Sequence, residues 1–130
     1  MNTETFGCNR CWPPWASAAW EAFLALSVEA ELVDESHFAV AIRACAGCGQ
    51  RFVIVFTELI DWVDGEDPQD WTVLPVTAAE AATLIEAGGA AIAPALAALA
   101  PRRRSLRREF PKGRRPRVHW DSGIIVGPHD

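Results

Sequence analysis

All four cysteines of the 130-residue chain occur in two Cys-x-x-Cys pairs, Cys8–Cys11 and Cys45–Cys48. In each pair a tight turn brings two sulfurs close together, so two such turns facing each other supply four thiolates. Four thiolates are a ligand set that structural zinc prefers, and a complete shell leaves no position for a substrate. The sequence therefore predicts one structural Zn²⁺ ion, with Cys8, Cys11, Cys45 and Cys48 as its ligands.

Other uses of the cysteines fit less well. Iron in a Cys₄ shell stays an alternative, because the ligands alone do not separate it from zinc. Redox chemistry is disfavoured by the presence of two pairs without thioredoxin-like surroundings. The polar N-terminus has no secretory signal, which predicts a cytoplasmic location where thiols stay reduced and disulfides are rare. Trp12 and Gly49 follow the two pairs, whereas attachment of c-type haem needs histidine there.

The first half of the chain predicts a helix and then strands. Helical spacing indicates a helix from Ser17, as its cap, to about Leu26, followed by a short strand over 28–33. The alternation within 24–32 also fits a single strand. Strict alternation predicts two further strands, 38–43 and 51–60, which form a hairpin with the second cysteine pair at its tip.

The second half mixes strands and helices. Residues 71–76 predict a third strand, which Pro75 would restrict to a sheet edge. Thr77 and Glu80 form a capping box, so a helix should begin at Ala78 and stop at Gly88-Gly89. Leu106 and Phe110 are four residues apart, which suggests an amphipathic helix within the basic segment. Further short elements are expected at 94–100, 117–120 and 124–126.

The second cysteine pair, Cys45-x-x-Cys48-Gly49 followed by Phe52, resembles the knuckle of the zinc-ribbon family. The resemblance covers residues 8–60 and implies a metal-binding hairpin, but no particular activity. The expected fold class is α+β: a small antiparallel sheet with this zinc-ribbon-like hairpin, flanked by two or three helices. The expected core consists of Phe38, Val40, Ile42, Phe52, Ile54, Phe56, Leu84 and Ile85.

Charge divides the chain into an acidic part and a basic part. Residues 1–100 carry three basic and fourteen acidic side chains, whereas residues 101–130 carry nine basic and three acidic ones. We expect one domain over 1–100, with 101–130 packed on it or extending from it. The basic segment could clamp the phosphates of a nucleic acid or pair with the acidic body. Its cations are Arg102, Arg103, Arg104, Arg107, Arg108, Lys112, Arg114, Arg115 and Arg117.

The acidic segment 61–70 offers a second candidate surface. Its carboxylates suit a hard cation, but Val63 stands where an EF-hand loop needs an acidic ligand, so a solvated loop is the simpler interpretation. Trp62 and Trp71 flank the acidic residues and could pack beneath them. The residues expected to contact a protein partner are Trp62, Asp64, Glu66, Asp67 and Trp71.

The sequence carries no familiar catalytic motif. It contains no P-loop, G-x-G-x-x-G, G-x-S-x-G or H-E-x-x-H. The longest uncharged stretch, 87–101, is too short and weakly apolar to span a bilayer. The leading hypothesis is a non-catalytic, zinc-stabilised adaptor that binds a protein partner. The alternatives are nucleic-acid binding through 102–117 and a small metalloenzyme that uses His119 or His129.

Overall fold

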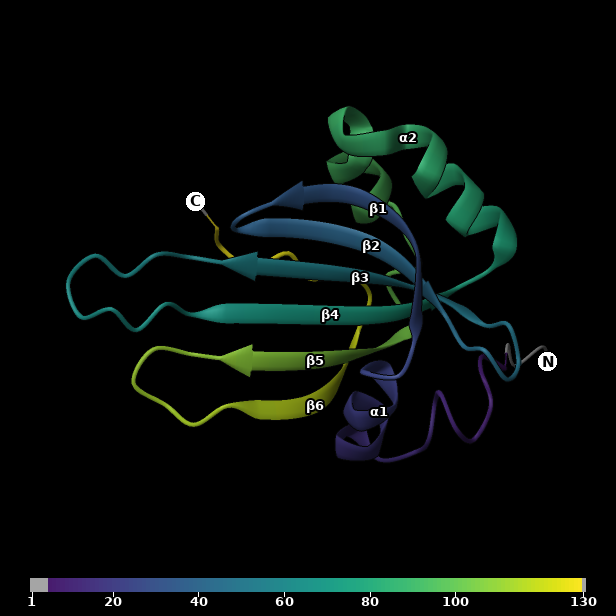
Figure 1. The fold of residues 1–130 in the computed structure, drawn as a ribbon, viewed down its shortest axis with the longest axis horizontal. Coiled ribbons are helices and arrows are strands. Elements are labelled where there is room, and N and C mark those ends of the chain that lie inside the picture. Colours follow the sequence, from purple (N-terminus) through teal and green to yellow (C-terminus); the bar gives the residue numbers. More distant parts are fainter. Residues whose placement is uncertain (1–4, 130) are drawn as a thin grey trace.

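The structure is a computed structural model that describes residues 5–129. Within them, six strands form one antiparallel sheet whose spatial order follows the chain, accompanied by two helices (Figure 1). The strands are β1 (Ser27–Glu35), β2 (Phe38–Ala44), β3 (Arg51–Glu58), β4 (Gln69–Val76), β5 (Arg104–Phe110) and β6 (Arg117–Ser122). The helices are α1 (Ala16–Phe23) and α2 (Ala78–Ala97).

The expected fold class is therefore wrong in its proportions. The chain is mostly sheet, and the small sheet flanked by two or three helices is replaced by six strands with one short and one long helix. The basic segment accounts for part of the difference, because it forms β5 rather than an amphipathic helix. Leu106 and Phe110 share a face of a strand as well as of a helix, since strand side chains alternate with a period of two.

Each helix lies against a different face of the sheet. On β3, Val53 and Val55 pack with α2, whereas Phe52 and Ile54 pack on the opposite face with α1 and the cysteine turns. This alternation explains why β3 is almost entirely buried. The fold thus has two apolar layers, and the first Cys-x-x-Cys turn belongs to the α1 layer.

Several local predictions are confirmed. β2 and β3 form the hairpin around the second cysteine pair. The Thr77 side chain accepts the backbone N–H of Glu80 at 3.1 Å, and the Glu80 carboxylate accepts the N–H of Thr77 at 2.8 Å, so the capping box is complete. The backbone leaves helical geometry at Gly88, where φ is 62°. The helix does not end at Gly88-Gly89 as expected, because α2 resumes directly after this kink and runs to Ala97. Pro94 lies inside α2 and does not begin a separate helix.

Other local predictions are wrong. β4 lies between β3 and β5, and Pro75 is tolerated because the pairing with β5 ends at Val73. The N-cap of α1 is Trp15, without a side-chain bond, so Ser17 does not cap it. Ile85 is 48% exposed and outside the core. Of the other expected core residues, Phe38 and Phe56 are half-buried, and Val40, Ile42, Phe52, Ile54 and Leu84 are buried.

The C-terminal residues lie over polar side chains of β4 and β5, on the face of the sheet that also carries α2. Residues 124–126 form no strand; instead the carbonyl of Ile125 accepts the Thr72 hydroxyl at 2.8 Å and Arg107 at 3.4 Å. Arg107 is buried beneath this segment between the carboxylates of Asp70 and Glu109. Among the described residues, no helix combines the length and apolar character needed to cross a bilayer.

Candidate metal centre

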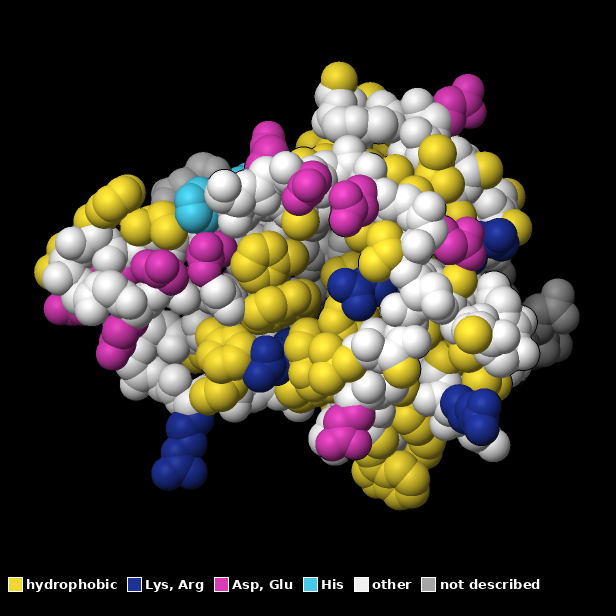
Figure 2. Space-filling view, viewed as in Figure 1, with side chains coloured by type: hydrophobic (Ala, Val, Ile, Leu, Met, Phe, Trp, Pro, Cys, Tyr) yellow, Lys and Arg dark blue, Asp and Glu magenta, His cyan; other side chains and the backbone are white. Residues whose placement is uncertain are grey.

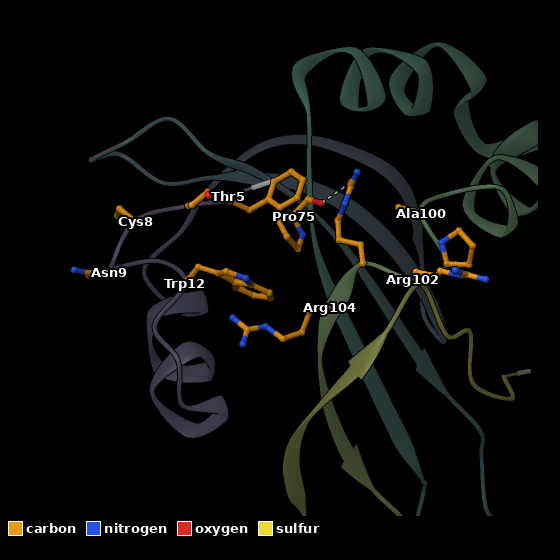
Figure 3. A pocket seen from close by; sticks show the side chains of 12 residues that line it. Thr5, Cys8, Asn9, Trp12, Pro75, Ala100, Arg102 and Arg104 are labelled. Atoms are coloured by element: carbon orange, nitrogen blue, oxygen red, sulfur yellow. Dashed lines mark hydrogen bonds between the residues drawn. The ribbon is translucent and has the colours of Figure 1, made fainter. Parts of the chain in front are cut away.

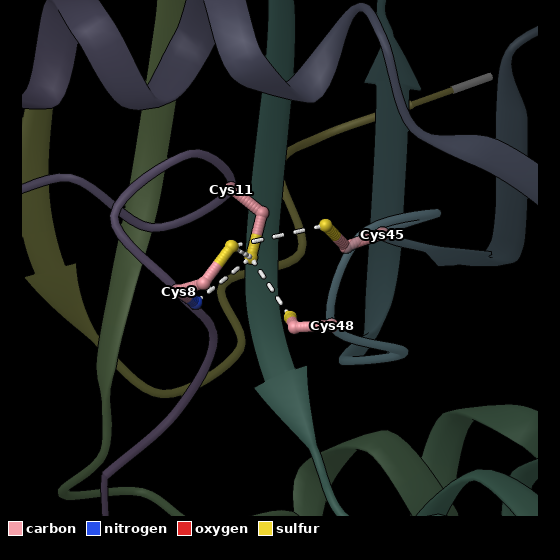
Figure 4. A group of neighbouring side chains, drawn as sticks. All are labelled: Cys8, Cys11, Cys45 and Cys48. Carbon is pink, nitrogen blue, oxygen red and sulfur yellow. Dashed lines mark hydrogen bonds between the residues drawn. The ribbon is translucent and has the colours of Figure 1, made fainter.

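The four cysteine sulfurs converge from two distant turns. All four lie within 4.8 Å of one another (Figure 4). Cys8 Sγ is 3.7 Å from Cys11 Sγ and 4.0 Å from Cys45 Sγ, and Cys11 Sγ is 3.7 Å from Cys48 Sγ. A tetrahedral ion with metal–sulfur bonds of about 2.3 Å has sulfur–sulfur edges of about 3.8 Å. The cluster therefore has the size of a tetrahedral thiolate shell and could hold a metal ion.

The first turn depends on a glycine that comes before the cysteines. Gly7 has φ of 70°, and a Cβ there would lie 2.9 Å from Cys11 Sγ and 2.7 Å from Trp12 Cβ. The turn is closed by a bond of 2.9 Å from the N–H of Trp12 to the carbonyl of Cys8, and the N–H of Cys8 points to Cys11 Sγ at 3.2 Å. Only glycine allows the chain to approach the sulfurs this closely.

The second turn lies at the tip of the β2–β3 hairpin. The N–H of Cys45 donates to the carbonyl of Gln50 at 2.9 Å, and the N–H of Gly49 donates to the carbonyl of Cys45 at 2.8 Å. Gly49 ends this turn with a φ of 79°, a positive value that glycine adopts without steric strain. The hairpin thus presents Cys45 and Cys48 as a preformed pair.

Gln50 joins the two turns, and the sequence alone did not reveal this role. Its Oε1 accepts the N–H of Gly7 at 2.9 Å, while its Nε2 donates to the carbonyls of Val76 and Arg51, each at 2.8 Å. One side chain therefore fixes the first cysteine turn to β3 and β4. The sequence signal that could have indicated this role was the position of Gln50, a polar residue just after the second cysteine pair and directly before an apolar strand.

The environment separates the four thiols into two kinds. Backbone N–H groups, first that of Cys11, lower the pKa of the Cys8 thiol to about 6, and the N–H of Cys48 lowers the pKa of Cys45. Burial raises the pKa of the thiols of Cys11 and Cys48. The four cysteines form no disulfide. A bound dication would favour the thiolate form of all four sulfurs and would leave no open coordination position.

Comparison with family models, curated proteins and solved structures finds no match to this chain. The close approach of the four cysteines marks a possible metal site, but no family match identifies the chain as a zinc ribbon.

The acidic loop between β3 and β4 holds itself together. The Asp61 carboxylate accepts three backbone N–H groups, from Val63, Asp64 and Glu66, at 3.1–3.3 Å. Lys112, from the β5–β6 loop, binds Asp61 at 3.0 Å and Asp64 at 2.8 Å. The ammonium group of Lys112, followed by these N–H groups, lowers the pKa of Asp61 to about 2. The Asp61 carboxylate therefore braces the loop.

The five residues expected to contact a partner are placed very differently. Trp62 is 87% exposed at the tip of the loop, which corrects the expectation that it lies beneath the acidic residues. Trp71 is half-buried on the α1 face, with its ring 4.7 Å from that of Phe56. Asp67 accepts the N–H of Asp61 at 2.8 Å. Asp64 and Glu66 are exposed.

The cations of the basic segment divide into three groups. Arg103, Arg107, Lys112 and Arg117 form ion pairs with carboxylates of the chain, among them Glu80, Asp70, Asp61 and Glu109 respectively. Arg104 and Arg108 lie on aromatic rings, 4.0 Å from the centroid of Trp120 and 4.1 Å from that of Phe110. Arg102, Arg114 and Arg115 are exposed. Figure 2 shows basic side chains set among hydrophobic ones on one face of the molecule.

The histidines expected for a metalloenzyme lie apart. His119 binds the Glu109 carboxylate at 3.1 Å, and the ring of His129 stacks on Phe38 with centroids 4.7 Å apart. Within residues 5–129, the four cysteines are the only group of three or more His, Cys, Asp or Glu side chains arranged to hold a metal. The third hypothesis therefore has no second metal site in the described residues.

Proposed function

We propose that the chain is a non-catalytic, zinc-stabilised binding protein that contacts a protein partner through the tip of the β3–β4 loop. The observation that carries the proposal is the exposure of Trp62 and Val63, 87% and 88%, on a loop fixed by its own hydrogen bonds. An ordered loop that holds two large apolar side chains in water favours burial of those side chains by another molecule. Tryptophan is also enriched among the residues that dominate protein interfaces.

The bracing of the loop supports a role in recognition. Lys112 links the β5–β6 loop to the β3–β4 loop through ion pairs with Asp61 and Asp64. The loop that contains Trp62 is therefore supported by a second hairpin. A preformed surface loses less conformational entropy on binding than a mobile loop does. The exposed carboxylates of Asp64 and Glu66 stand beside the apolar tip. A fitting partner therefore has an apolar pocket with basic residues on its rim.

Zinc is the ion that fits the four cysteines best. An all-thiolate tetrahedral shell suits Zn²⁺ and makes it a structural rather than a catalytic ion. Elemental analysis of the purified protein should find about one zinc per chain. Iron in place of zinc would give visible thiolate-to-iron absorption, and a metal-free protein of unchanged stability would refute the structural role.

The partner surface is tested with a pair of variants that remove exposed tryptophan at different places. Immobilised full-length protein, the Trp62→Ala/Val63→Ser variant and Trp15→Ala are compared in capture from native lysate. Trp15 is 71% exposed and lies at the start of α1, which makes it a matched control. We expect a protein that the wild type and Trp15→Ala retain and that the tip variant loses, with affinity for the purified partner about tenfold or more weaker. Equal retention by the tip variant would refute the proposed surface.

A further inference from the structure

A large cavity lies where the first cysteine turn meets the start of β5. Its volume is about 820 Å³, and its walls include Phe6, Asn9, Trp12 and three consecutive arginines, 102–104 (Figure 3). No Asp or Glu is among the described residues that line it, although the first 100 residues are strongly acidic. The size lies within the range of small-molecule sites.

A strained turn places the three arginines at this cavity. Ala100 has φ of 34°, the only positive φ of a non-glycine residue in the described part of the chain. The turn is closed by the N–H of Arg103, which donates to the carbonyl of Ala100 at 3.0 Å, and Gly123 donates to the carbonyl of Arg103 at 2.8 Å. Backbone strain of this kind is concentrated at functional sites.

The arginines differ in what already binds them. Arg103 is committed to the protein, because its Nη1 donates to the Pro75 carbonyl at 3.0 Å and to Glu80 at 2.6 Å. Arg102 and Arg104 form no ion pair with a carboxylate in residues 5–129. Arg104 instead lies over Trp120, at 4.0 Å, and Trp12, at 5.7 Å. Two guanidinium groups without a carboxylate partner therefore remain available to an anion.

Aromatic rings also line the cavity beside the cysteines, and arginines lie over them: Arg103 is 4.4 Å from the centroid of Phe6 and Arg104 is 5.7 Å from that of Trp12. Trp12 and Phe6 are half-buried at the cavity, next to Cys8. A dication bound by four thiolates has a net charge of about −2, which makes the side of the cavity next to the cysteines the unfavourable end for an anion. The charge distribution thus favours a ligand whose anionic group lies at Arg102 and Arg104 and whose uncharged ring lies beside Trp12, next to the Arg104 guanidinium.

We propose that this cavity binds a phosphate group attached to a planar ring, which is the chemistry of a nucleotide. Guanidinium groups match phosphate oxygens through paired N–H donors. Planar rings stack on tryptophan with little dependence on their identity. The site is distinct from the proposed partner surface, which lies at the tip of the β3–β4 loop. A free nucleotide and the phosphorylated end of a single strand both present this chemistry.

The proposal is tested by calorimetric titration of the metal-loaded full-length protein at low salt. The probes are adenosine monophosphate, adenosine, inorganic phosphate and a 5′-phosphorylated tetranucleotide. We expect the monophosphate or the tetranucleotide to bind about tenfold or more tightly than adenosine or phosphate alone. Tighter binding of the tetranucleotide identifies a strand end as the source, and equal or weaker binding identifies a free nucleotide. No binding of either up to about 1 mM would overturn the proposal.

Variants decide whether binding occurs at this cavity. Arg102 is exposed, so Arg102→Ala should fold normally and weaken binding about fivefold or more, and Arg104→Gln should do the same. Arg114→Ala/Arg115→Ala removes two exposed arginines of the β5–β6 loop and should change the affinity less than about twofold. If both cavity variants bind as well as the wild type, or if the control pair is equally impaired, the assigned site is wrong.

Discussion

Replacement of Gln50 by leucine is expected to weaken metal binding about tenfold while the protein stays folded. The Gln50 side chain hydrogen-bonds both to the loop of the first cysteine turn, at Gly7, and to the sheet, at Val76 and Arg51. Leucine has nearly the same size, so the change removes hydrogen bonds without a large change in packing. The two cysteine turns then lose a direct link.

The magnitude follows from the three bonds. Each contributes about 0.5–1.5 kcal/mol, so the total loss is about 1.5–4.5 kcal/mol, which is below the stability of a typical domain. Only the bond to Gly7 holds the segment that carries Cys8 and Cys11. Its loss accounts for about 1–1.5 kcal/mol of the metal-bound arrangement, and about 1.4 kcal/mol corresponds to a tenfold change in affinity.

The assay is competition for zinc with a chromophoric chelator, combined with urea unfolding of the metal-loaded protein. Gln69→Leu is the matched control, because Gln69 is also half-buried and its Nε2 donates to Glu58 far from the cysteines. The control should lose stability without losing metal affinity. The reasoning is refuted if Gln50→Leu and Gln69→Leu bind zinc equally well.

Three further predictions concern the cysteines, acid and the C-terminal segment. Cys45→Ser should lose bound metal and several kcal/mol of unfolding free energy, and a chelator should destabilise the wild type but not the variant, measured by urea unfolding with elemental analysis. Burial alone would raise the pKa of Glu109, but donors from Arg117, His119 and Arg107 lower it to about 2. The ionised Glu109 carboxylate thus stabilises the fold above the ordinary pKa of 4.5, and this stabilisation is lost as pH falls toward 2. In Glu109→Gln the melting temperature should therefore fall less steeply between pH 4.5 and pH 2 than in the wild type. An equally steep fall in both proteins would contradict this. Gly127→Ala should cost about 1–3 kcal/mol, because a Cβ would collide with Asp70 and approach Thr57 Oγ1 to 2.6 Å. At Gly89 a Cβ would make only an ordinary contact, 3.7 Å from the carbonyl oxygen of Leu32, so Gly89→Ala is the control. Equal melting temperatures of the two variants would contradict this.

Local signals in the sequence predicted local structure well. The capping box at Thr77 and the hairpin around the second cysteine pair each depend on residues within a few positions of one another. The helix end predicted at Gly88-Gly89 is a kink inside α2, because packing of Ile92 and Leu96 in the core continues the helix. The convergence of the two cysteine pairs was also predictable, although it is non-local, because the chain contains no other cysteines and metal chemistry needs all four sulfurs together.

Non-local pairing defeated the remaining predictions. β5 was misread because Leu106 and Phe110 fit both a helix and a strand, and only the neighbouring β4 decides between them. The roles of Gln50 and Ala100 depend on partners brought together by the fold, so residue type alone gave no indication of them. The basic segment shows the same limit: its charges indicated an acidic partner, and part of that partner is the protein's own Glu80, Asp70 and Asp61.

The topology also determines which part of the protein the metal should stabilise. Every strand pairs with its neighbour in sequence, and the strands are joined directly by loops except between β4 and β5, where α2 lies. The N-terminal layer is held differently: Cys8 meets Cys45, and the indole of Trp120 donates to the carbonyl of Pro14 at 3.0 Å. Because such distant contacts carry a larger entropic cost of closure, removal of the metal should release this layer first. Hydrogen exchange of the chelated protein should therefore quicken in residues 7–23 before it quickens in α2 and β2–β3. A uniform increase across both layers would show that the ion supports the whole fold.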